Sequence, residues 1–274
     1  MGDNDSRESV RRVIRRVLAA TCACREHDFT TDGVVVTQAG ELPGRLRFPV
    51  WSRPLLVVTM GAGVVVSCHA ERVEPLRAVL GHLPRDAIFS ATTIAQLARL
   101  VERDGQLLAG PDLKYACSRA DFRPAAVPAG VEVTLVEEDG MAALYRYRGF
   151  GAALSYRPNS ARPERLASVA ARAGQIVGIA AASADADDLW QIGVEVSAGA
   201  QGSGIGRALV SRLTEGILDK GKFPYYTTVV SNIRSRSLAI SLGYWPAWTE
   251  LYARDHEGCQ KGGGQRRKPE KAQQ

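Results

Sequence analysis

The chain has 274 residues, of which 45% are hydrophobic and 23% are charged, and its formal net charge is +6. This length accommodates two domains of ordinary size, and the composition is that of a soluble globular protein. No apolar run approaches the length of a membrane span, which excludes an integral membrane protein. The N-terminal arginines are mixed into an amphipathic pattern, unlike a signal peptide, so we expect a cytoplasmic protein with no membrane partner.

Five cysteines, an odd number, favour free thiols over disulfides in that compartment. The cluster Cys22-x-Cys24-x-x-His27 does not have a usual zinc-ligand spacing, so we expect no metal site.

Residues 1–122 predict a small α/β domain. Its first helix, over residues 5–24, has a regular apolar side, and Asp5 with Glu8 is spaced as a capping box. None of the N-terminal elements carries a chemical motif, so the role of this domain stays open. The other expected elements are strands over 34–36, 45–48, 55–59 and 64–68, and helices over 71–80 and 91–103, the last capped by Ser90.

A Pro/Ala/Gly-rich stretch over residues 123–130 is typical of a linker. A second domain is expected over 131–256, beginning with a strand at 131–136 and a helix near 138–148. Residues 257–274 are basic and rich in glycine and glutamine, which predicts a disordered tail. Because no aromatic residues alternate with these basic residues, we expect no specific nucleic-acid partner.

The most informative segment is Leu189–Gly206, in which an apolar strand runs into a glycine-rich turn and then a helix. The helix has Ile205, Leu209 and Leu213 on one side. Free backbone N–H groups at the start of a helix, together with the helix dipole, favour phosphate oxygens. Glycine lets a ligand approach that backbone closely, so the turn predicts a phosphate-binding loop.

A dinucleotide-binding turn is one interpretation of this loop. It requires several further βαβ units and an acidic residue at the end of the next strand. The next strand, over residues 224–230, instead ends in Ser231-Asn232, and little chain follows it. We therefore do not favour this interpretation.

The motif order from residue 131 to 255 resembles the GNAT superfamily of acetyl-CoA-dependent N-acetyltransferases. Val196 stands five residues before Gln201-x-x-Gly204-x-Gly206, as in that family, although Ala198 replaces the usual proline. Downstream, Asn232 and Leu242-Gly243-Tyr244 resemble the family's Asn and Leu-Gly-Phe/Tyr segment. The resemblance implies a mixed α/β fold with a splayed central sheet flanked by helices, preceded here by the smaller α/β domain.

The resemblance also implies that acetyl-CoA is the cofactor. Backbone groups of the strand would pair with the pantetheine amides, the loop would hold the pyrophosphate, and Arg234 or Arg236 are further candidates for the adenosine phosphate. The implied cofactor-binding residues are Val194, Val196, Gln201, Gly202, Ser203, Gly204, Ile205, Gly206, Arg207, Asn232 and Ser235.

The acid and base are harder to place. Many relatives have a tyrosine acid seven residues after the asparagine, but Ala239 stands there. Ser235, Ser237, Tyr225, Tyr226 and water remain open as the acid. For the base, the resemblance favours Asp188, with Glu195 second. Asp188 is equally well explained as a turn residue, and strand alternation places Glu195 opposite Val194 and Val196.

An acidic turn containing Asp185, Asp187 and Asp188, beside Trp190, favours a cationic acceptor such as an aminosugar. Gln191 and Ser231 are lesser acceptor contacts, and Trp190 is otherwise a core aromatic. The leading hypothesis is therefore acetyl transfer to a small-molecule primary amine, for example an aminoglycoside-type or other antibiotic, which would confer resistance. Acetylation of a protein or peptide amine and a non-catalytic acyl-CoA-binding module are alternatives, and the expectation allows for a homodimer.

Overall fold

The computed structural model describes residues 6–48, 52–154 and 160–255. The predicted tail at 257–274 and the predicted cap Asp5 lie outside these residues. The described chain divides into two units that are interleaved in sequence. The first contains residues up to Ala116, Thr227–Arg236 and the strand that begins at Trp245, and the second contains Cys117–Tyr226 and Ser237–Tyr244.

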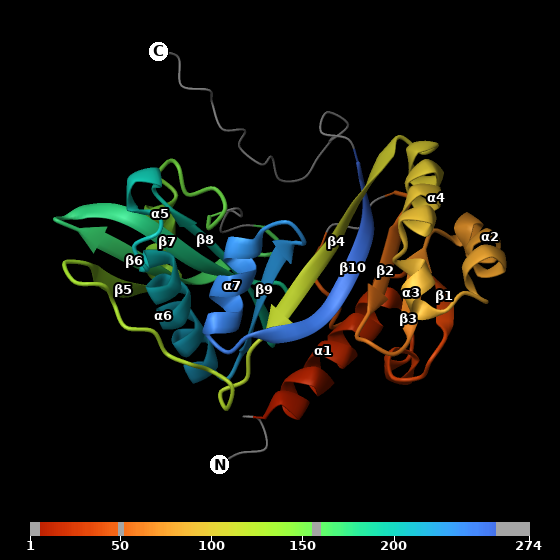
Figure 1. Cartoon of the computed structure of the whole chain (residues 1–274), viewed down its shortest axis with the longest axis horizontal. Coiled ribbons are helices and arrows are strands. Elements are labelled where there is room, and N and C mark those ends of the chain that lie inside the picture. The colour runs from red at the N-terminus through yellow and green to blue at the C-terminus, as the bar shows by residue number, and fades with distance from the viewer. Residues whose placement is uncertain (1–5, 49–51, 155–159, 256–274) are drawn as a thin grey trace. The chain divides into compact units, whose positions relative to one another are not determined.

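The strands of the first unit lie in the order β1-β3-β2-β10-β4 (Figure 1). β1 and β3 are parallel, and the other neighbouring pairs are antiparallel. β10 therefore lies between β2 and β4, although it is the last strand in the sequence. The bounds are β1 Val34–Gln38, β2 Leu55–Thr59, β3 Val64–Cys68, β4 Gln106–Ala116 and β10 Trp245–Asp255.

One core of the first unit forms where its helices cover the strands. Leu76 of α2, Ile88 of α3 and Leu97 of α4 are buried against residues of β1, β2, β3 and β10. α1 has a separate apolar side, which buries Val10 and Ile14. The helices are α1 Arg7–Cys22, the short 3-10 helix η1 Glu26–Phe29, α2 Ala70–Leu80, α3 Arg85–Ile88 and α4 Ala91–Glu102.

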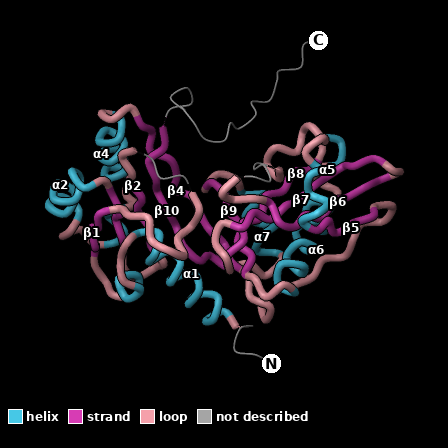
Figure 2. Tube along the Cα trace, turned by 180° about the vertical axis from the view of Figure 1, so that it is seen from behind, coloured by secondary structure: helices cyan, strands magenta, loops and turns pink. Residues whose placement is uncertain are grey.

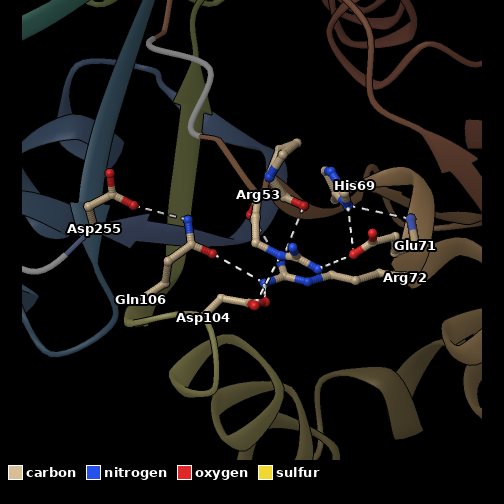
Figure 3. A network of polar contacts seen from close by, with 8 residues as sticks. Arg53, His69, Glu71, Arg72, Asp104, Gln106 and Asp255 are labelled. Atoms are coloured by element: carbon tan, nitrogen blue, oxygen red, sulfur yellow. Dashed lines mark hydrogen bonds and ion pairs between the residues drawn. The ribbon is translucent and has the colours of Figure 1, made fainter.

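A polar network fastens these helices to the strands (Figure 3). Arg72 of α2 is 3% exposed, and it donates to the carbonyl oxygen of Arg53, to Asp104 after α4 and to Gln106 of β4. Arg53 in turn pairs with Glu71 and Asp104. An adjacent hollow of about 270 Å³ is lined by these charges together with Arg103, Pro75 and Leu100.

Several N-terminal predictions need correction. α1 begins at Arg7, so its N-cap is Ser6, whose Oγ accepts the N–H of Ser9. Residues 45–48 form no strand. β4 was not predicted, and this strand continues through Gly110-Pro111. β10 pairs with β2 and β4 rather than extending the predicted second domain.

The strands of the second unit lie in the order β9-β8-β7-β6-β5, with β8 parallel to β9 and the other pairs antiparallel. The division between the units falls within β9 and α7. The predicted helix at 138–148 is only a short 3-10 turn followed by one helical turn. The bounds are β5 Glu132–Glu137, η2 Glu138–Gly140, α5 Met141–Leu144, β6 Glu164–Arg172, β7 Gln175–Ala184, β8 Leu189–Val196, η3 Ala198–Ala200, α6 Ile205–Asp219, β9 Phe223–Val229 and α7 Ile233–Ser241.

The two faces of these strands are covered by different elements (Figure 2). On one face, a Cβ at Gly178 would meet Leu209 and Ile205 of α6, and Val196 of β8 lies there too. On the other, Met141 and Leu144 of α5 pack with Ile179 of β7. Because side chains alternate along a strand, even-numbered residues of β8 face α6 and odd-numbered residues face α5. This mixed α/β fold with a splayed strand pair confirms the predicted fold class.

Candidate functional site

The glycine-rich loop forms the centre of the candidate site. None of the N–H groups from Gly202 to Arg207 donates a hydrogen bond to any residue in the described part of the chain, and the first bond of α6 is from Ala208 to Gly204. The loop from Gln201 to Gly204 is exposed. A row of free donors at the positive end of a 15-residue helix is an anion-binding arrangement.

Two glycines give this loop its shape. Gly202 and Gly204 have φ values of 78° and 82°, a left-handed conformation that is costly for residues with a Cβ. A Cβ at Gly202 would meet nothing within 4 Å, so the space beside the backbone is open. Ser203 closes the turn by donating its hydroxyl to the carbonyl oxygen of Ala200 over 2.6 Å.

β8 leads into this loop with one open edge. Its register against β9 ends at Ile192–Tyr226, four residues before β8 ends. The N–H of Ser197 bonds to Val177 on β7, so odd-numbered residues of β8 direct their backbone groups toward β7 and even-numbered residues direct theirs away. The backbone groups of Val194 and Val196 therefore face the open edge. The carbonyl oxygen of Val196 accepts the side-chain amide of Gln201 over 3.2 Å.

Several predicted cofactor-binding residues lie at the N-terminal end of α7. Asn232 Oδ1 accepts the N–H of Ser235 over 3.1 Å, which leaves the Nδ2 of this exposed side chain as the available end. Arg236 bonds to the Tyr115 hydroxyl and to the carbonyl oxygen of Val230, so its guanidinium is held by the protein. Arg207 and Arg234 are exposed.

Ala239, which stands where many relatives have a tyrosine acid, is fully buried. Tyr226 is 3% exposed and packs edge-on against Tyr244, with ring centroids 6.3 Å apart. Tyr225 is also fully buried, on the other face of β9. The structure thus gives no exposed tyrosine on the described part of β9.

The acidic turn between β7 and β8 differs from the prediction. Asp185 is fully buried, and Arg162 bonds to both of its carboxylate oxygens over 2.7 and 2.6 Å. Asp188 pairs with Lys222 over 3.1 Å. The open edge of β8 starts at Gly193, which is about 17 Å along the strand from Asp188. Asp187 alone is an exposed carboxylate of the turn. The prediction of Asp185 as a surface contact is therefore corrected, and the turn interpretation of Asp188 fits the structure better than the base interpretation.

Trp190 and Glu195 lie on opposite faces of β8. Trp190 is 8% exposed and belongs to the α6 face, so it is a core aromatic rather than an acceptor contact. Glu195 is half-buried on the α5 face, where Oε2 accepts the N–H of Ala152 over 2.8 Å. Gln191 and Gly193 share that face, and a Cβ at Gly193 would lie 2.3 Å from the Ala152 carbonyl oxygen.

Sequence reasoning missed a buried polar network beside Gln191. Arg162, Ser183 and Tyr225 all bond to Asp185, and Arg162 and Tyr225 also bond to Gln191. Nearby, Tyr145 donates to the buried carboxylate of Glu164, and burial with this bond raises the pKa of Tyr145 above its usual range. The alternation of side chains along β8 could have placed Gln191 on the α5 face. Arg162 lies in an irregular segment before β6, and no sequence pattern there predicts its role.

The described residues contain neither a cluster of metal-binding side chains nor a helix long and apolar enough to cross a bilayer.

The candidate site lies in a part of the chain that matches a protein family model. Residues 138–244 match the model of the acetyltransferase (GNAT) family, and this range includes β8, the loop, α6 and α7. The C-terminal half of the chain therefore contains a domain of the GNAT acetyltransferase family. No curated protein matches the chain.

Solved structures similar to the chain include GNAT proteins from two bacteria. A GCN5-related N-acetyltransferase from Kribbella flavida is 22% identical, with a TM-score of 0.45, and the match covers 59% of this chain and 64% of that one. A GCN5-related N-acetyltransferase-like protein from Streptococcus suis is 19% identical, with a TM-score of 0.44 and coverage of 64% and 78%. An aminoglycoside acetyltransferase from an uncultured soil metagenomic sample is 15% identical, with a TM-score of 0.30 and coverage of 41% and 87%. The chain thus spans less than two thirds of the Kribbella flavida protein.

Proposed function

We propose that this protein is an acetyl-CoA-dependent N-acetyltransferase that acts on a primary amine of a small molecule by direct attack in a ternary complex. The observation that carries the proposal is the run of N–H groups from Gly202 to Arg207, which donate to no described residue, beside the open edge of β8. The family match supports the reaction class.

The residues present fit coenzyme A. The loop donors would hold the pyrophosphate, since no Cβ fills the space beside Gly202. The backbone groups of Val194 and Val196 would pair with the pantetheine amides as an added strand does, once the Gln201 side chain leaves the Val196 carbonyl oxygen. Asn232 would offer its Nδ2, and Arg207 is an exposed cation for a phosphate.

The reaction requires a neutral amine close to the thioester. The amine nitrogen attacks the carbonyl carbon, the C–S bond breaks, and the proton released by the nitrogen is balanced by protonation of the CoA sulfur. Holding the two reactants together lowers the entropic part of the barrier. Of the predicted catalytic carboxylates, Glu195 is the one that shares the α5 face with Gln191, and we propose that it accepts the amine proton through water. Ser235 remains a candidate donor to the sulfur.

The structure alters which class of amine acceptor is expected. An aminoglycoside-type antibiotic was expected from three acidic turn residues, but Arg162 neutralises Asp185 and Lys222 pairs with Asp188. A polycationic acceptor therefore loses most of its support. A small amine without several positive charges fits the remaining groups better, and peptide amines are the alternative acceptor class.

The test combines binding with turnover. Calorimetry with CoA should detect binding to the wild-type protein, and free thiol should be released when acetyl-CoA is mixed with a panel of small amines and short peptides. Mass spectrometry should then show one added acetyl group on an amine. Absence of CoA binding would refute the proposal, while acetylation of peptides alone would move it to the protein-amine alternative.

A non-catalytic acyl-CoA-binding module is the second candidate. It is favoured by Ala239, which is buried and cannot act as an acid, and by the ion pair that occupies Asp188. CoA binding without thiol release for any member of the panel, together with unchanged affinity in Glu195→Gln, would support it.

A further inference from the structure

Gln191 has one end of its side-chain amide fixed by buried donors. Its Oε1 accepts from Arg162 Nη2 over 3.0 Å and from the Tyr225 hydroxyl over 2.9 Å. Both donors are held in turn by Asp185, which is fully buried and takes two bonds from Arg162 and one from Tyr225. Arg162 is 7% exposed and Tyr225 is fully buried, so this part of the network excludes water.

The chemistry of the donors decides which way the amide points. A guanidinium can only donate hydrogen bonds, so the atom of Gln191 that meets Arg162 must be the oxygen. The NH₂ group must therefore point away from the network. Gln191 Nε2 has no hydrogen-bond partner in the described part of the chain. Because it is not one of the fully enclosed polar atoms without a partner, part of its surface is accessible. Gln191 itself is only half-buried.

The position of this NH₂ group connects it with the proposed reaction. Gln191 pairs with Tyr225 in the β8–β9 register, and the last pair is Ile192–Tyr226, after which the edge of β8 is open. Gln191 lies on the α5 face, beside Gly193, where the backbone of Ala152 crosses the strand. An acceptor that reaches the open edge of β8 from this face would pass the amide of Gln191.

We propose that Gln191 binds the acceptor through its side-chain N–H groups, that Arg162 and Tyr225 are positioning residues that fix this orientation, and that the preferred acceptor carries a hydrogen-bond-accepting oxygen beside its amine. This inference rests on the proposed function. Two N–H donors without a partner among the described residues can bond to an ether, hydroxyl or carbonyl oxygen but not to a methylene group.

The test compares two amines of nearly equal shape, 2-methoxyethylamine and n-butylamine, which differ by an oxygen in place of a methylene. Because the two amines differ in pKa, each kcat/KM is calculated for the neutral amine, and the wild-type value should then favour the methoxy compound by about tenfold, the value of one good hydrogen bond. Gln191→Met, which removes the donors at similar size, should bring the ratio of the two kcat/KM values close to one. Tyr225→Phe, which removes one of the two donors that hold Oε1, should lower the ratio. Using the ratio cancels any general loss of activity.

Ser183→Ala is the matched control. Ser183 Oγ bonds to Asp185 over 2.7 Å and no side-chain bond joins it to Gln191, so this variant should keep the wild-type preference. If Tyr225→Phe and Ser183→Ala change the ratio equally, the network has only a structural role and the positioning claim is wrong. Equal kcat/KM for both amines in the wild-type protein, or an unchanged ratio in Gln191→Met, overturns the inference and leaves acetyl transfer intact.

If neither amine is acetylated, a binding measurement by NMR tests the inference instead. The side-chain NH₂ signals of Gln191 are assigned in ¹H–¹⁵N spectra by their loss in Gln191→Met, and each amine is titrated with and without CoA. A shift with 2-methoxyethylamine but not with n-butylamine supports the inference. No shift, or equal shifts, refutes it, whereas failure of the proposed function is recognised separately by the absence of CoA binding.

Discussion

At the scale of single residues, Gly204 tests the phosphate loop directly. Its φ of 82° costs about 1–2 kcal/mol for a residue with a Cβ, so Gly204→Ala should twist the loop and turn N–H groups away from the ligand. We expect the Kd for CoA, measured by calorimetry, to rise about tenfold or more.

Gly199→Ala is the control for that change, because Gly199 has no positive φ and a Cβ there meets nothing within 4 Å. It should bind CoA as the wild-type protein does. If both variants bind normally, the loop is not the pyrophosphate site.

A second residue-scale prediction concerns Ala239. Because this residue is fully buried, Ala239→Tyr must force a large side chain into a filled core, and overpacking of this kind typically costs about 1–3 kcal/mol. We expect a lower Tm and no gain in kcat. Ile240→Tyr places the same ring at a position that is 50% exposed and should leave the Tm unchanged. A faster enzyme with an unaltered Tm in Ala239→Tyr would show that the site accepts a tyrosine acid.

Asp112 gives a prediction on pH. It is 8% exposed and lies opposite Glu250 in the β4–β10 register, and the two carboxylates share Lys114. Burial raises the pKa of Asp112, Glu250 raises it further, and Lys114, Tyr252 and Arg254 lower it. A raised carboxyl pKa means that the folded state holds the proton more tightly, so stability falls as the pH rises through the usual value and then the folded one.

Asp112→Asn should therefore have a higher Tm than the wild-type protein at neutral pH, and the difference should vanish toward about pH 4, the usual pKa of aspartate. Asp86→Asn is a control of opposite sign, since Arg85 lowers the pKa of Asp86. Melting curves from pH 4 to 8 check both, and a lower Tm for Asp112→Asn at pH 7 would contradict the argument.

At the scale of elements, the sequence predicts what depends on local pattern. The strand, loop and helix from Leu189 to Asp219 follow from an apolar run, glycines at the turn and a regular apolar side, and the structure contains them. The α4 cap at Ser90 is local too, and its Oγ accepts the N–H of Thr93. The helix predicted at 138–148 is a single turn, and propensity alone does not stabilise a short helix.

Elements whose partners are distant in sequence were not predictable in the same way. Most residues of β10 are buried, but nothing in its sequence says that it enters the strand order between β2 and β4. The buried ion pair between Arg162 and Asp185 likewise joins residues that are separated by two strands. Asp185 has the same sequence context as an exposed turn aspartate, so its burial depends on an arginine that no local pattern identifies.

At the scale of the whole molecule, β10 determines which fragments can fold. Residues 1–116 contain every complete strand of the first unit except β10, so in that fragment β2 and β4 would each lose β10 as a neighbour. Unpaired strand edges with apolar faces aggregate. We therefore expect the fragment 1–116 to be insoluble or to lack a cooperative melting transition.

Restoring β10 should rescue the first unit. Trp245 is the register partner of Ala116 in the antiparallel β4–β10 pair, so a two-residue Asn-Gly turn can join them as a hairpin. The chain 1–116-Asn-Gly-245–255 should be soluble and melt cooperatively. The same chain with Leu251, which is fully buried in the core of this unit, replaced by aspartate is the control and should fail. If the fragment 1–116 folds alone, the first unit does not need β10 in order to fold, and its boundary then lies at Ala116.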